Sequence, residues 1–560
     1  MDTATLTLVF VGGSFALYFV IALKSRAAST GDFYVASRGV PPIANGMATA
    51  ADFMSVAAML SVPGIIAVAG YDASVYLLGP PGGFLLLGML IAPYLRKFGK
   101  FTIPDFIGDR YYSNSARSLA VICALFVSMT YLAGQMRGVG VVFSRFLEVP
   151  IESGVLIGSG MVFVYSVWGG MKGVTYTQVA QFVVLAFAFL VPIIFLSILV
   201  TDSAFPMISW GGKTADGSVF LIDKLDGLNQ EFGFKAFTAR ERPKIDLFCI
   251  ALTLMLGTAG MPHIIIRFFT VPRVSDARRS VAYTLLFVGL VFVTVPALSA
   301  FSRLFILESV ENQTHADAPE WFRTWEETGL VVFDDKNGDG LIQYVGGEEN
   351  ELTIDNDIAF LAVPEIAELS NWVVALVAAG TLAAALSTAA GLLLVISMSV
   401  SHDLVKSQLF PALDDRHELL VARIAAGFAV AVGAYFGIHP PSFIIETIAL
   451  AFSIAASAFF PVLVLGIFSK RMNKEGAIAG MASGLLFSVS YIVYYQFLGG
   501  SEHGYWMDIS PQGIGVAGMI VNLTVALTTS KFFPAPPSAV QEMVEGIRYP
   551  TLRSEDAGSA

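Results

Sequence analysis

Stretches of about 20 apolar residues recur along the whole chain, and they limit its fold more than any other feature. A helix of about 20 residues crosses a hydrocarbon layer of about 30 Å, where backbone polar groups must be paired within the protein. Only 14% of the 560 residues are charged, against about 25% in typical soluble domains. The sequence therefore predicts an all-α polytopic membrane protein and excludes a soluble globular one.

The apolar stretches predict about thirteen transmembrane helices. The first stretch has neither a basic flank nor a small-residue cleavage site, so we expect a retained leading helix instead of a signal peptide. The expected spans are 5–23, 42–70, 74–95, 117–147, 152–170, 178–200, 246–271, 279–306, 370–400, 418–437, 443–468, 476–498 and 512–530.

Charged residues in the loops predict the orientation. Short loops rich in Lys and Arg stay in the cytoplasm. The segments 96–117, 273–279 and 470–474 are basic, whereas 308–368 is strongly acidic. We therefore expect a multi-pass protein of a bacterial inner (plasma) membrane, with its N-terminus outside. The polar tail from about 531 is expected to be a poorly ordered cytoplasmic segment.

Two apolar segments are interrupted at matching places. "SVPG" interrupts the span 42–70, and "LGTAGMPH" interrupts the span 246–271, five spans later and in the opposite predicted orientation. Paired broken helices in oppositely oriented units are typical of inverted-repeat transporters, in which freed backbone groups can bind ions and solutes. The alternative is that Gly and Pro are simply frequent in membrane helices; two matching breaks make that alternative weaker than a single break would.

Four stretches, in order, resemble the sodium:solute symporter family. They are "GDFYVASRGV" at 31–40, "YSVWGGMKGVTYTQVAQ" at 165–181, "GMPHIIIRFF" at 260–269 and "AAALSTAAG" at 383–391. Within the family, the second and third are most similar to the cation/acetate (monocarboxylate) symporter branch. The resemblance implies a LeuT-type 5+5 inverted repeat, with one leading helix and two trailing helices. It also implies a secondary active transporter, and not an enzyme, that imports a small monocarboxylate such as acetate with sodium by alternating access.

On this plan the chain divides into six parts. They are 1–41, leading helix and cytoplasmic loop; 42–201, first repeat; 202–245, outer loop; 246–468, second repeat with an acidic outer loop at 307–369; 469–530, two trailing helices; and 531–560, cytoplasmic tail.

Other functions stay open at this point. A sodium symporter for another small solute, such as an amino acid, fits the same pattern, and so does a membrane sensor related to transporters. A membrane enzyme lacks support, because no HExxH, CxxC or GxSxG motif lies near a membrane edge. The expected partners are the lipid bilayer, a small carboxylate substrate and, as in some similar proteins, a small membrane subunit; nucleic acid is not expected.

The resemblance implies a sodium ion between the broken span 42–70 and the span 370–400. The matching ligands are the carbonyls of Ala51, Met54 and Ala384 and the hydroxyls of Ser387 and Thr388. Ala384, Ser387 and Thr388 follow i, i+3, i+4 spacing and share one helix face. Neutral oxygens suit a hard cation that must later be released. On spacing alone, hydroxyls that merely pack helices are an equal alternative.

Two further polar residues belong to this region. Asp52 is expected to orient the break by accepting backbone N–H groups or to line the ion route, with a structural hydrogen bond as the alternative. Gln178 stands where many relatives carry an Asp linked to sodium passage, so a second sodium site is not implied.

The expected substrate residues lie at the two breaks and on the span 117–147. Arg137 is a candidate partner for a carboxylate, since Arg forms paired hydrogen bonds with such groups; a structural tie to Glu446 or to a backbone carbonyl is the alternative. His263 and Arg267 match family positions after the second break, and Arg267 is expected to snorkel toward the cytoplasmic surface or to gate rather than to contact the substrate. The substrate residues are Ser55, Gln135, Arg137, Thr258, Gly260 and Met261.

The acidic stretch "DDKNGDGLIQYVGGEE" resembles the first half of an EF-hand loop. Asp335, Asn337 and Asp339 take positions 1, 3 and 5, and Gly340 takes position 6, as a calcium loop requires. Position 12 is Gly346, where Glu is expected. A structural calcium ion and an unbound acidic turn are both consistent with this pattern.

Overall fold

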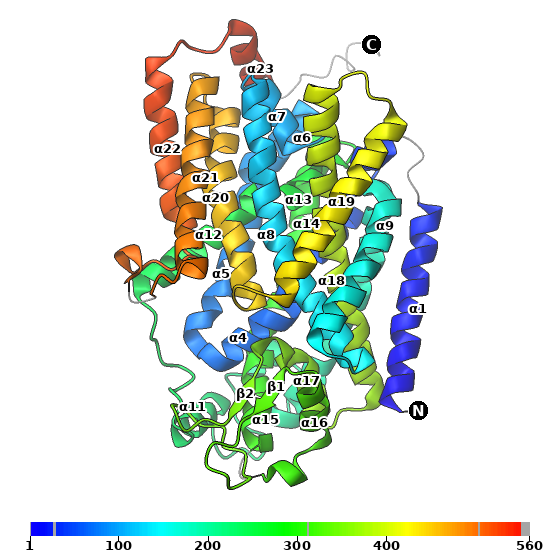
Figure 1. The fold of residues 1–560 in the computed structure, drawn as a ribbon, viewed down its shortest axis with the longest axis vertical. Coiled ribbons are helices and arrows are strands. Elements are labelled where there is room, and N and C mark those ends of the chain that lie inside the picture. Colours follow the sequence, from blue (N-terminus) through cyan, green and yellow to red (C-terminus); the bar gives the residue numbers. More distant parts are fainter. Residues whose placement is uncertain (1, 26–29, 311–312, 502–503, 550–560) are drawn as a thin grey trace, which may run out of the picture.

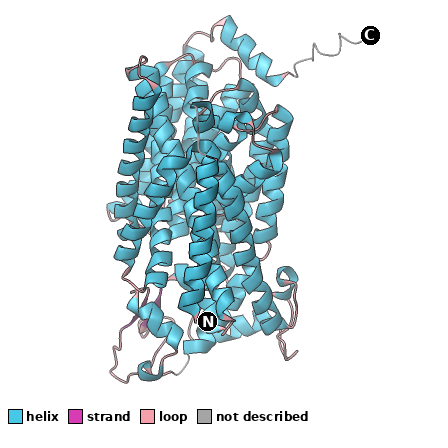
Figure 2. Ribbon diagram, turned by 90° about the vertical axis from the view of Figure 1, so that its right-hand side faces the viewer, coloured by secondary structure: helices cyan, strands magenta, loops and turns pink. Residues whose placement is uncertain are grey.

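The protein is an elongated bundle of helices in the computed structural model (Figures 1 and 2). Residues 2–25, 30–310, 313–501 and 504–549 are described, so the last part of the predicted tail, 550–560, lies outside the described residues. The N-terminus lies at the same end of the bundle as the acidic loop (residues 307–369), and the last described helix lies at the opposite end (Figure 1). Which end faces the cytoplasm stays a prediction.

The first half of the chain forms the leading helix and the first group of packed helices. The leading helix is α1 (Thr3–Lys24), and the first interrupted segment consists of α3 (Pro42–Phe53), η2 (Ala57–Ser61) and α4 (Val62–Ala69). The other elements of this half are α2 (Thr30–Val35), η1 (Ala36–Arg38), η3 (Gly70–Ser74), α5 (Val75–Leu86), η4 (Leu87–Ile91), α6 (Ala92–Phe98), α7 (Ile103–Arg110), α8 (Asn114–Leu147), α9 (Ile151–Thr201), α10 (Pro206–Ser209) and α11 (Leu221–Glu231).

The second half begins with the second interrupted segment. It consists of α12 (Lys244–Gly260), α13 (Pro262–Ile265) and η5 (Ile266–Phe269), and it bends by 46° at the break. The remaining helices are α14 (Val274–Phe292), α15 (Val295–Val310), η6 (His315–Asp317), α16 (Glu320–Glu327), η7 (Asn356–Ile358), α17 (Ala359–Ile366), α18 (Asn371–Met398), η8 (Ser399–Leu409), α19 (Asp415–Ile438), α20 (Ile444–Phe468), α21 (Lys474–Phe497), η10 (Trp506–Asp508), α22 (Gly515–Phe532) and α23 (Ser538–Arg548).

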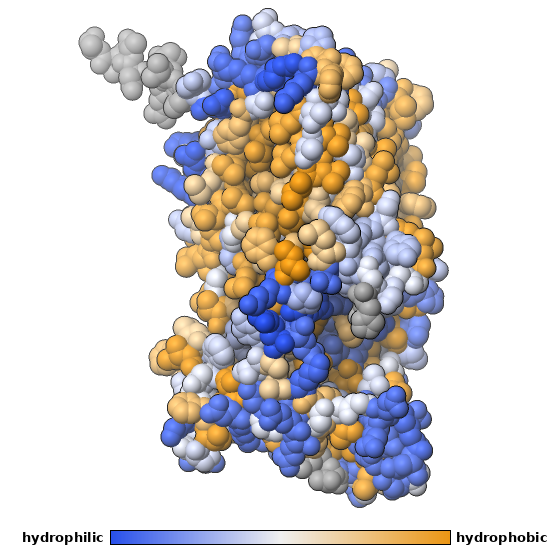
Figure 3. Space-filling model, turned by 90° about the vertical axis from the view of Figure 1, so that its left-hand side faces the viewer, coloured by the Kyte–Doolittle hydropathy of each residue, from blue (hydrophilic) through white to orange (hydrophobic). Residues whose placement is uncertain are grey.

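The helical bundle has the surface of a membrane protein. Its helices present a mostly hydrophobic flank, and hydrophilic residues gather toward both ends (Figure 3). Within the described residues, ten helices are long and apolar enough to cross a membrane, or eleven when the bent pair is counted as one span. Some expected spans are joined without a break, as in the continuous helical stretch Ala57–Phe98, which covers most of the expected spans 42–70 and 74–95. The protein is therefore a multi-pass membrane protein, and the count of thirteen spans stays a prediction.

The expected loop between the spans 152–170 and 178–200 is absent from the structure. Residues 151–201 form one long helical run with a single non-helical residue, Gly170, at φ 55° and ψ −179°. Glycine adopts a positive φ without a steric penalty. The chain can therefore change direction at this one residue, and 171–177 continue as helix.

The expectation of a poorly ordered tail is corrected. The tail forms the helix α23, whose Val540, Val544 and Ile547 are buried, because its apolar residues recur at helical spacing and have a surface to pack against. Lys97 donates to the carbonyl of Gly546 at 2.6 Å, which ties this helix to α6. The acidic loop contains two short antiparallel strands, β1 (Val331–Phe333) and β2 (Leu352–Ile354).

Candidate functional site

The first break interrupts the helix at the end of α3. The helix ends at Phe53, and Met54 leaves helical geometry with φ −74° and ψ 64°. The N–H of Ser55 then donates to the carbonyl of Phe53 at 2.7 Å, in place of a helical i−4 acceptor. Pro63 cannot donate at all, so it frees a further acceptor near the start of α4. The break therefore leaves carbonyl oxygens without helical partners in a fully buried region.

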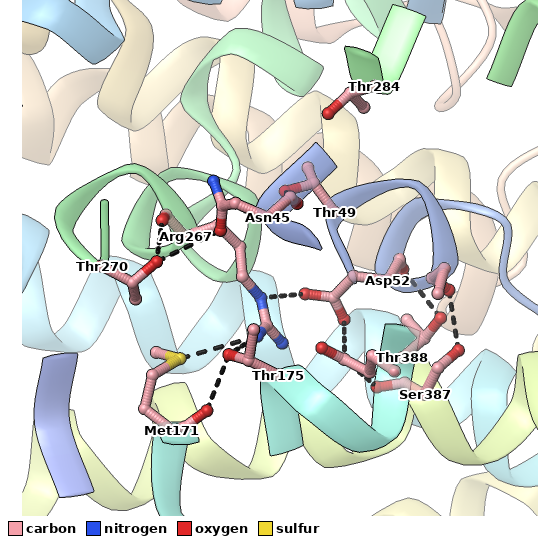
Figure 4. A network of polar contacts seen from close by, with 12 residues as sticks. Asn45, Thr49, Asp52, Met171, Thr175, Arg267, Thr270, Thr284, Ser387 and Thr388 are labelled. Atoms are coloured by element: carbon pink, nitrogen blue, oxygen red, sulfur yellow. Dashed lines mark hydrogen bonds and ion pairs between the residues drawn. The ribbon is translucent and has the colours of Figure 1, made fainter. Parts of the chain in front are cut away.

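Hydroxyl groups of α18 face these carbonyls (Figure 4). Ser387 Oγ donates to the carbonyls of Ala51 at 2.7 Å and Ala384 at 2.9 Å, and Thr388 Oγ1 donates to the carbonyl of Asp52 at 2.7 Å. The Asp52 carbonyl was not among the expected ligands. Four of the five expected sodium ligands thus gather in one place, and the fifth, Met54, is the buried residue at the end of α3.

The Asp52 side chain reaches away from these oxygens and pairs with Arg267. Its Oδ2 lies 3.0 Å from Arg267 Nε, and neither side chain is exposed at all. Its Oδ1 accepts from Gln178 Nε2 at 3.3 Å, and the same amide donates to the carbonyl of Ser387 at 2.8 Å. Asp52 therefore has side-chain partners instead of the expected backbone N–H groups. Gln178, at the position that departs from the family pattern, connects Asp52 to the helix that carries the hydroxyls.

The expectation that Arg267 snorkels to the membrane surface is wrong. The break after Gly260 turns the short segment α13–η5 back into the bundle, so that Arg267 points at α3. Its Nη1 also donates to Thr175 Oγ1 at 3.1 Å and contacts the sulfur of Met171 at 3.6 Å (Figure 4). Among the described residues, Nη2 has no hydrogen-bond partner. A buried guanidinium whose Nη2 group has no acceptor is costly unless something pairs with it.

A second group of buried polar side chains lies between the two breaks. Tyr131 donates to Ser55 Oγ at 3.3 Å, and its ring centroid lies 5.1 Å from that of His263. Neither ring nitrogen of His263 and neither amide atom of Gln135 has a hydrogen-bond partner among the described residues. Tyr131 precedes Gln135 by one helical turn, so both lie on the same face of α8. Tyr131 therefore contacts both Ser55 and His263, and the buried Gln135 lies one turn further along the same face of α8.

Sequence reasoning missed Tyr131 and gave His263 no role beyond its match to a family position. The spacing of Tyr131 four residues before Gln135 was a usable signal, because residues at i and i+4 share a face. No spacing in the sequence relates α8 to α13, so the meeting of Tyr131 with His263 needed the structure.

The other expected substrate residues are engaged elsewhere. Thr258 Oγ1 donates to the carbonyl of Leu254 in its own helix at 2.7 Å. Gly260 lies against α20, where an added Cβ would come within 2.9 Å of the Ala455 carbonyl. The remaining residue at this break, Met261, is fully buried. The glycine side of the second break therefore packs on α20. The side chains that follow the break, His263 and Arg267, contact Tyr131 and Asp52 instead.

Arg137 is held by the acidic loop. Its Nη2 lies 3.1 Å from Asp355 Oδ2, with 14% and 18% of the two side chains exposed. Arg137 therefore forms a structural ion pair, as the alternative proposed. Its partner is not Glu446, because Glu446 pairs with Arg242 at 3.3 Å. The acid that follows strand β2 reaches Arg137 only because the loop folds back over the end of α8.

Further polar contacts lie toward the acidic loop and toward the opposite end of the bundle. At the acidic-loop end, the Arg137–Asp355 pair lies beside Asp357; burial raises the pKa of Asp357 to about 7, and the charge of Asp355 adds to the rise. At the opposite end, the Tyr34 hydroxyl donates to Glu418, and His402 lies 3.2 Å from the same carboxylate.

The expected calcium residues Asp335, Asn337 and Asp339 lie apart from this region, in an exposed turn of the acidic loop.

Comparison with a solved structure defines the class. A substrate-bound, outward-open Na⁺-coupled sialic acid symporter superposes with a TM-score of 0.69 over 95% of this chain and 98% of that one, at 14% identity. The fold is that of LeuT-type transporters, with an inverted pair of interrupted helices at its centre.

Sequence comparison then gives the family. The sodium:solute symporter family model matches residues 33–310 and 342–484. An uncharacterized symporter of Cupriavidus necator is 31% identical over 648 aligned positions, which cover 98% of this chain and 94% of that relative. The chain belongs to the sodium:solute symporter family, whose members couple the movement of a solute to that of sodium.

Proposed function

We propose that this protein is a sodium-coupled symporter that imports a small monocarboxylate such as acetate across a bacterial inner membrane by alternating access. The observation that supports sodium binding is the meeting of the Ser387 and Thr388 hydroxyls with the carbonyls at the α3 break. A hydroxyl can rotate its hydrogen away and offer a lone pair, so the same oxygens can surround a cation. A site of neutral oxygens also releases its ion readily.

Unpartnered donors support a carboxylate as the solute. A carboxylate that leaves water must regain hydrogen bonds from the protein. His263, Gln135 and Arg267 Nη2 each have donor capacity that no described residue uses, and all three side chains are fully buried. His263 and Arg267 are four residues apart on the segment after the second break, which brings their side chains toward one face. In this proposal Arg267, and not Arg137, is the charged partner of the carboxylate.

The packing of the central region supports a short solute. The Tyr131 ring lies 5.1 Å from His263 and 5.9 Å from Phe452, centroid to centroid. Rings at these separations are in contact, so the space between the two breaks suits a solute of few carbon atoms. In this proposal, alternating access opens the polar contacts at the two ends one at a time. The small membrane subunit stays a prediction.

Counterflow in proteoliposomes tests the proposal. Vesicles loaded with unlabelled acid should accumulate a labelled C2–C5 monocarboxylate, with sodium required on the outside. Gln135→Leu, which keeps the side-chain volume but removes the donor, should weaken solute binding while sodium binding without solute is kept.

The alternatives give different results in the same assay. Sodium-dependent exchange of an amino acid but of no monocarboxylate would identify an amino-acid symporter. Solute binding to the purified protein without any exchange would favour a membrane sensor. Exchange that is equally fast in potassium would contradict sodium coupling.

A further inference from the structure

We propose that the acidic loop binds one calcium ion between Asp335, Asn337, Asp339 and Glu351. The first three residues are those of the EF-hand-like pattern. The fourth was not foreseen, and it supplies the carboxylate that the pattern lacks at its last position.

Position 12 of the pattern cannot carry a glutamate in this fold. Gly346 occupies that position, and its N–H donates to the carbonyl of Phe232 at 2.8 Å. A Cβ at Gly346 would lie 2.1 Å from the carbonyl oxygen of Gly233, closer than real Cβ atoms approach. The missing glutamate is therefore explained by the close packing of residues 232–233 on this turn, and the loop must take its last ligand from elsewhere.

Glu351 provides that ligand from the residue just before β2. Its side chain is 97% buried, since only 3% of the residue is exposed. One oxygen, Oε1, accepts from the backbone N–H groups of Lys336 and Asn337 at 2.9 and 3.1 Å. The other, Oε2, has no hydrogen-bond partner among the described residues. A buried carboxylate oxygen without a partner is unfavourable, and a bound cation would remove this cost.

Three carboxylates converge on the same point. Asp335, Asp339 and Glu351 each offer a carboxylate oxygen, and these oxygens all lie within 4.8 Å of one another. The turn is held by backbone N–H donors, Gly338 to Asp335 at 2.7 Å and Leu341 to Asp339 at 2.8 Å. The carboxylates therefore share one centre before any ion is bound.

The nearest positive charge does not fill this centre. The ammonium of Lys336 donates to the carbonyls of Glu348 and Asn350 at 3.0 and 2.7 Å, so it does not pair with the clustered carboxylates. Three carboxylates and one amide oxygen, completed by water, suit calcium, which takes six to eight oxygens in flexible geometry. Magnesium requires a nearly ideal octahedron and keeps its waters, so it should bind more weakly here.

The ion would also fix the part of the loop that reaches the solute region. The ladder of β1 and β2 begins at Phe333 and Leu352, next to the proposed ligands. Its other end leads to Asp355, which pairs with Arg137 of α8. Calcium would therefore stabilise the strand pair that holds Asp355 in place.

The test uses the full-length protein in detergent after treatment with a calcium chelator. Calcium added to about 10 mM, above the weakest affinities of extracellular calcium modules, should raise the melting temperature in a saturable way, and magnesium should raise it much less. Titration calorimetry should give one calcium per chain.

Matched variants separate this site from general charge effects. Glu351→Gln can still accept from Lys336 and Asn337 but loses the charge, and it should weaken calcium binding at least about tenfold. Glu349→Gln, which removes an exposed charge from the same loop, should bind calcium like the wild type. If Glu351→Gln does not fold, Asp339→Ala gives the same readout. An equal shift with magnesium, no calcium shift, or equal loss in Glu349→Gln would overturn the proposal.

Discussion

The two interrupted helices take equivalent places in the inverted fold, yet their breaks are built from different groups. At the first break, the carbonyls of Ala51 and Asp52 meet the hydroxyls of Ser387 and Thr388, so the surface is made of oxygens. At the second break, Gly257 and Gly260 lie against the backbone of α20, so carbonyls there are covered. The side chains that follow it, His263 and Arg267, present N–H groups instead.

This difference matches the charges of the two proposed ligands, sodium and a carboxylate. Oxygen atoms suit a cation and N–H groups suit an anion. The Asp52–Arg267 ion pair, at 3.0 Å, links the two breaks directly. We infer that the repeats kept a common backbone geometry and diverged in which hydrogen-bonding groups they expose.

The largest expected effect follows from separating the pair that joins the breaks. Arg267→Ala leaves the Asp52 carboxylate buried without a positive partner, which should cost about 3–5 kcal/mol of stability. The double variant Asp52→Asn/Arg267→Gln removes both charges and should lose much less. Thermal melting of the purified proteins checks both. A single variant as stable as the wild type would show that the pair does not hold the breaks together.

The next effect should be confined to the oxygen-lined break. Ser387→Ala/Thr388→Ala removes two of the proposed sodium ligands, each worth about 1.5 kcal/mol by analogy with hydrogen bonds to charged groups. The sodium concentration for half-maximal uptake should then rise about a hundredfold. The control is Thr381→Ala/Ser397→Ala on the same helix, whose hydroxyls bond to carbonyls of their own helix at 2.8 and 2.6 Å. Unchanged sodium dependence in the first variant would move the ion elsewhere.

A smaller effect is expected at the break that is covered by α20. A Cβ on Gly257 would lie 2.5 Å from the Phe452 carbonyl oxygen, and such overpacking costs about 1–3 kcal/mol. Gly257→Ala should therefore lower the melting temperature without raising the sodium requirement. Gly160→Ala, at a helix position with nothing within 4 Å of the added Cβ, serves as the control. A sodium defect in Gly257→Ala would mean that the two breaks do not have separate roles.

The smallest effect concerns the charge at the edge of the solute region. Arg137 is partly exposed and paired with Asp355, and pairs of this kind are worth about 0–1 kcal/mol. Arg137→Gln should leave carboxylate affinity, measured by calorimetry on folded protein, within about twofold of the wild type. A large loss of affinity would return Arg137 to the role of carboxylate partner and weaken the assignment of Arg267.

Local sequence patterns determined the class of fold and one half of the site. The apolar stretches required membrane helices, and the Gly and Pro residues marked both breaks, because each property acts within a few residues of chain. The spacing of Ala384, Ser387 and Thr388 likewise put them on one face. These four-residue relations are set by helix geometry and hold in any tertiary context.

Contacts between distant segments were decided only by the tertiary structure. Asp52 and Arg267 are 215 positions apart, and neither residue's neighbours in sequence indicate the partner. The same holds for Tyr131 with His263, for Arg137 with Asp355, and for Glu351 beside an EF-hand-like turn that ends too early. Burial gives the physical reason: a charged or polar side chain inside the bundle must find a partner, but which partner it finds depends on how the helices and loops pack.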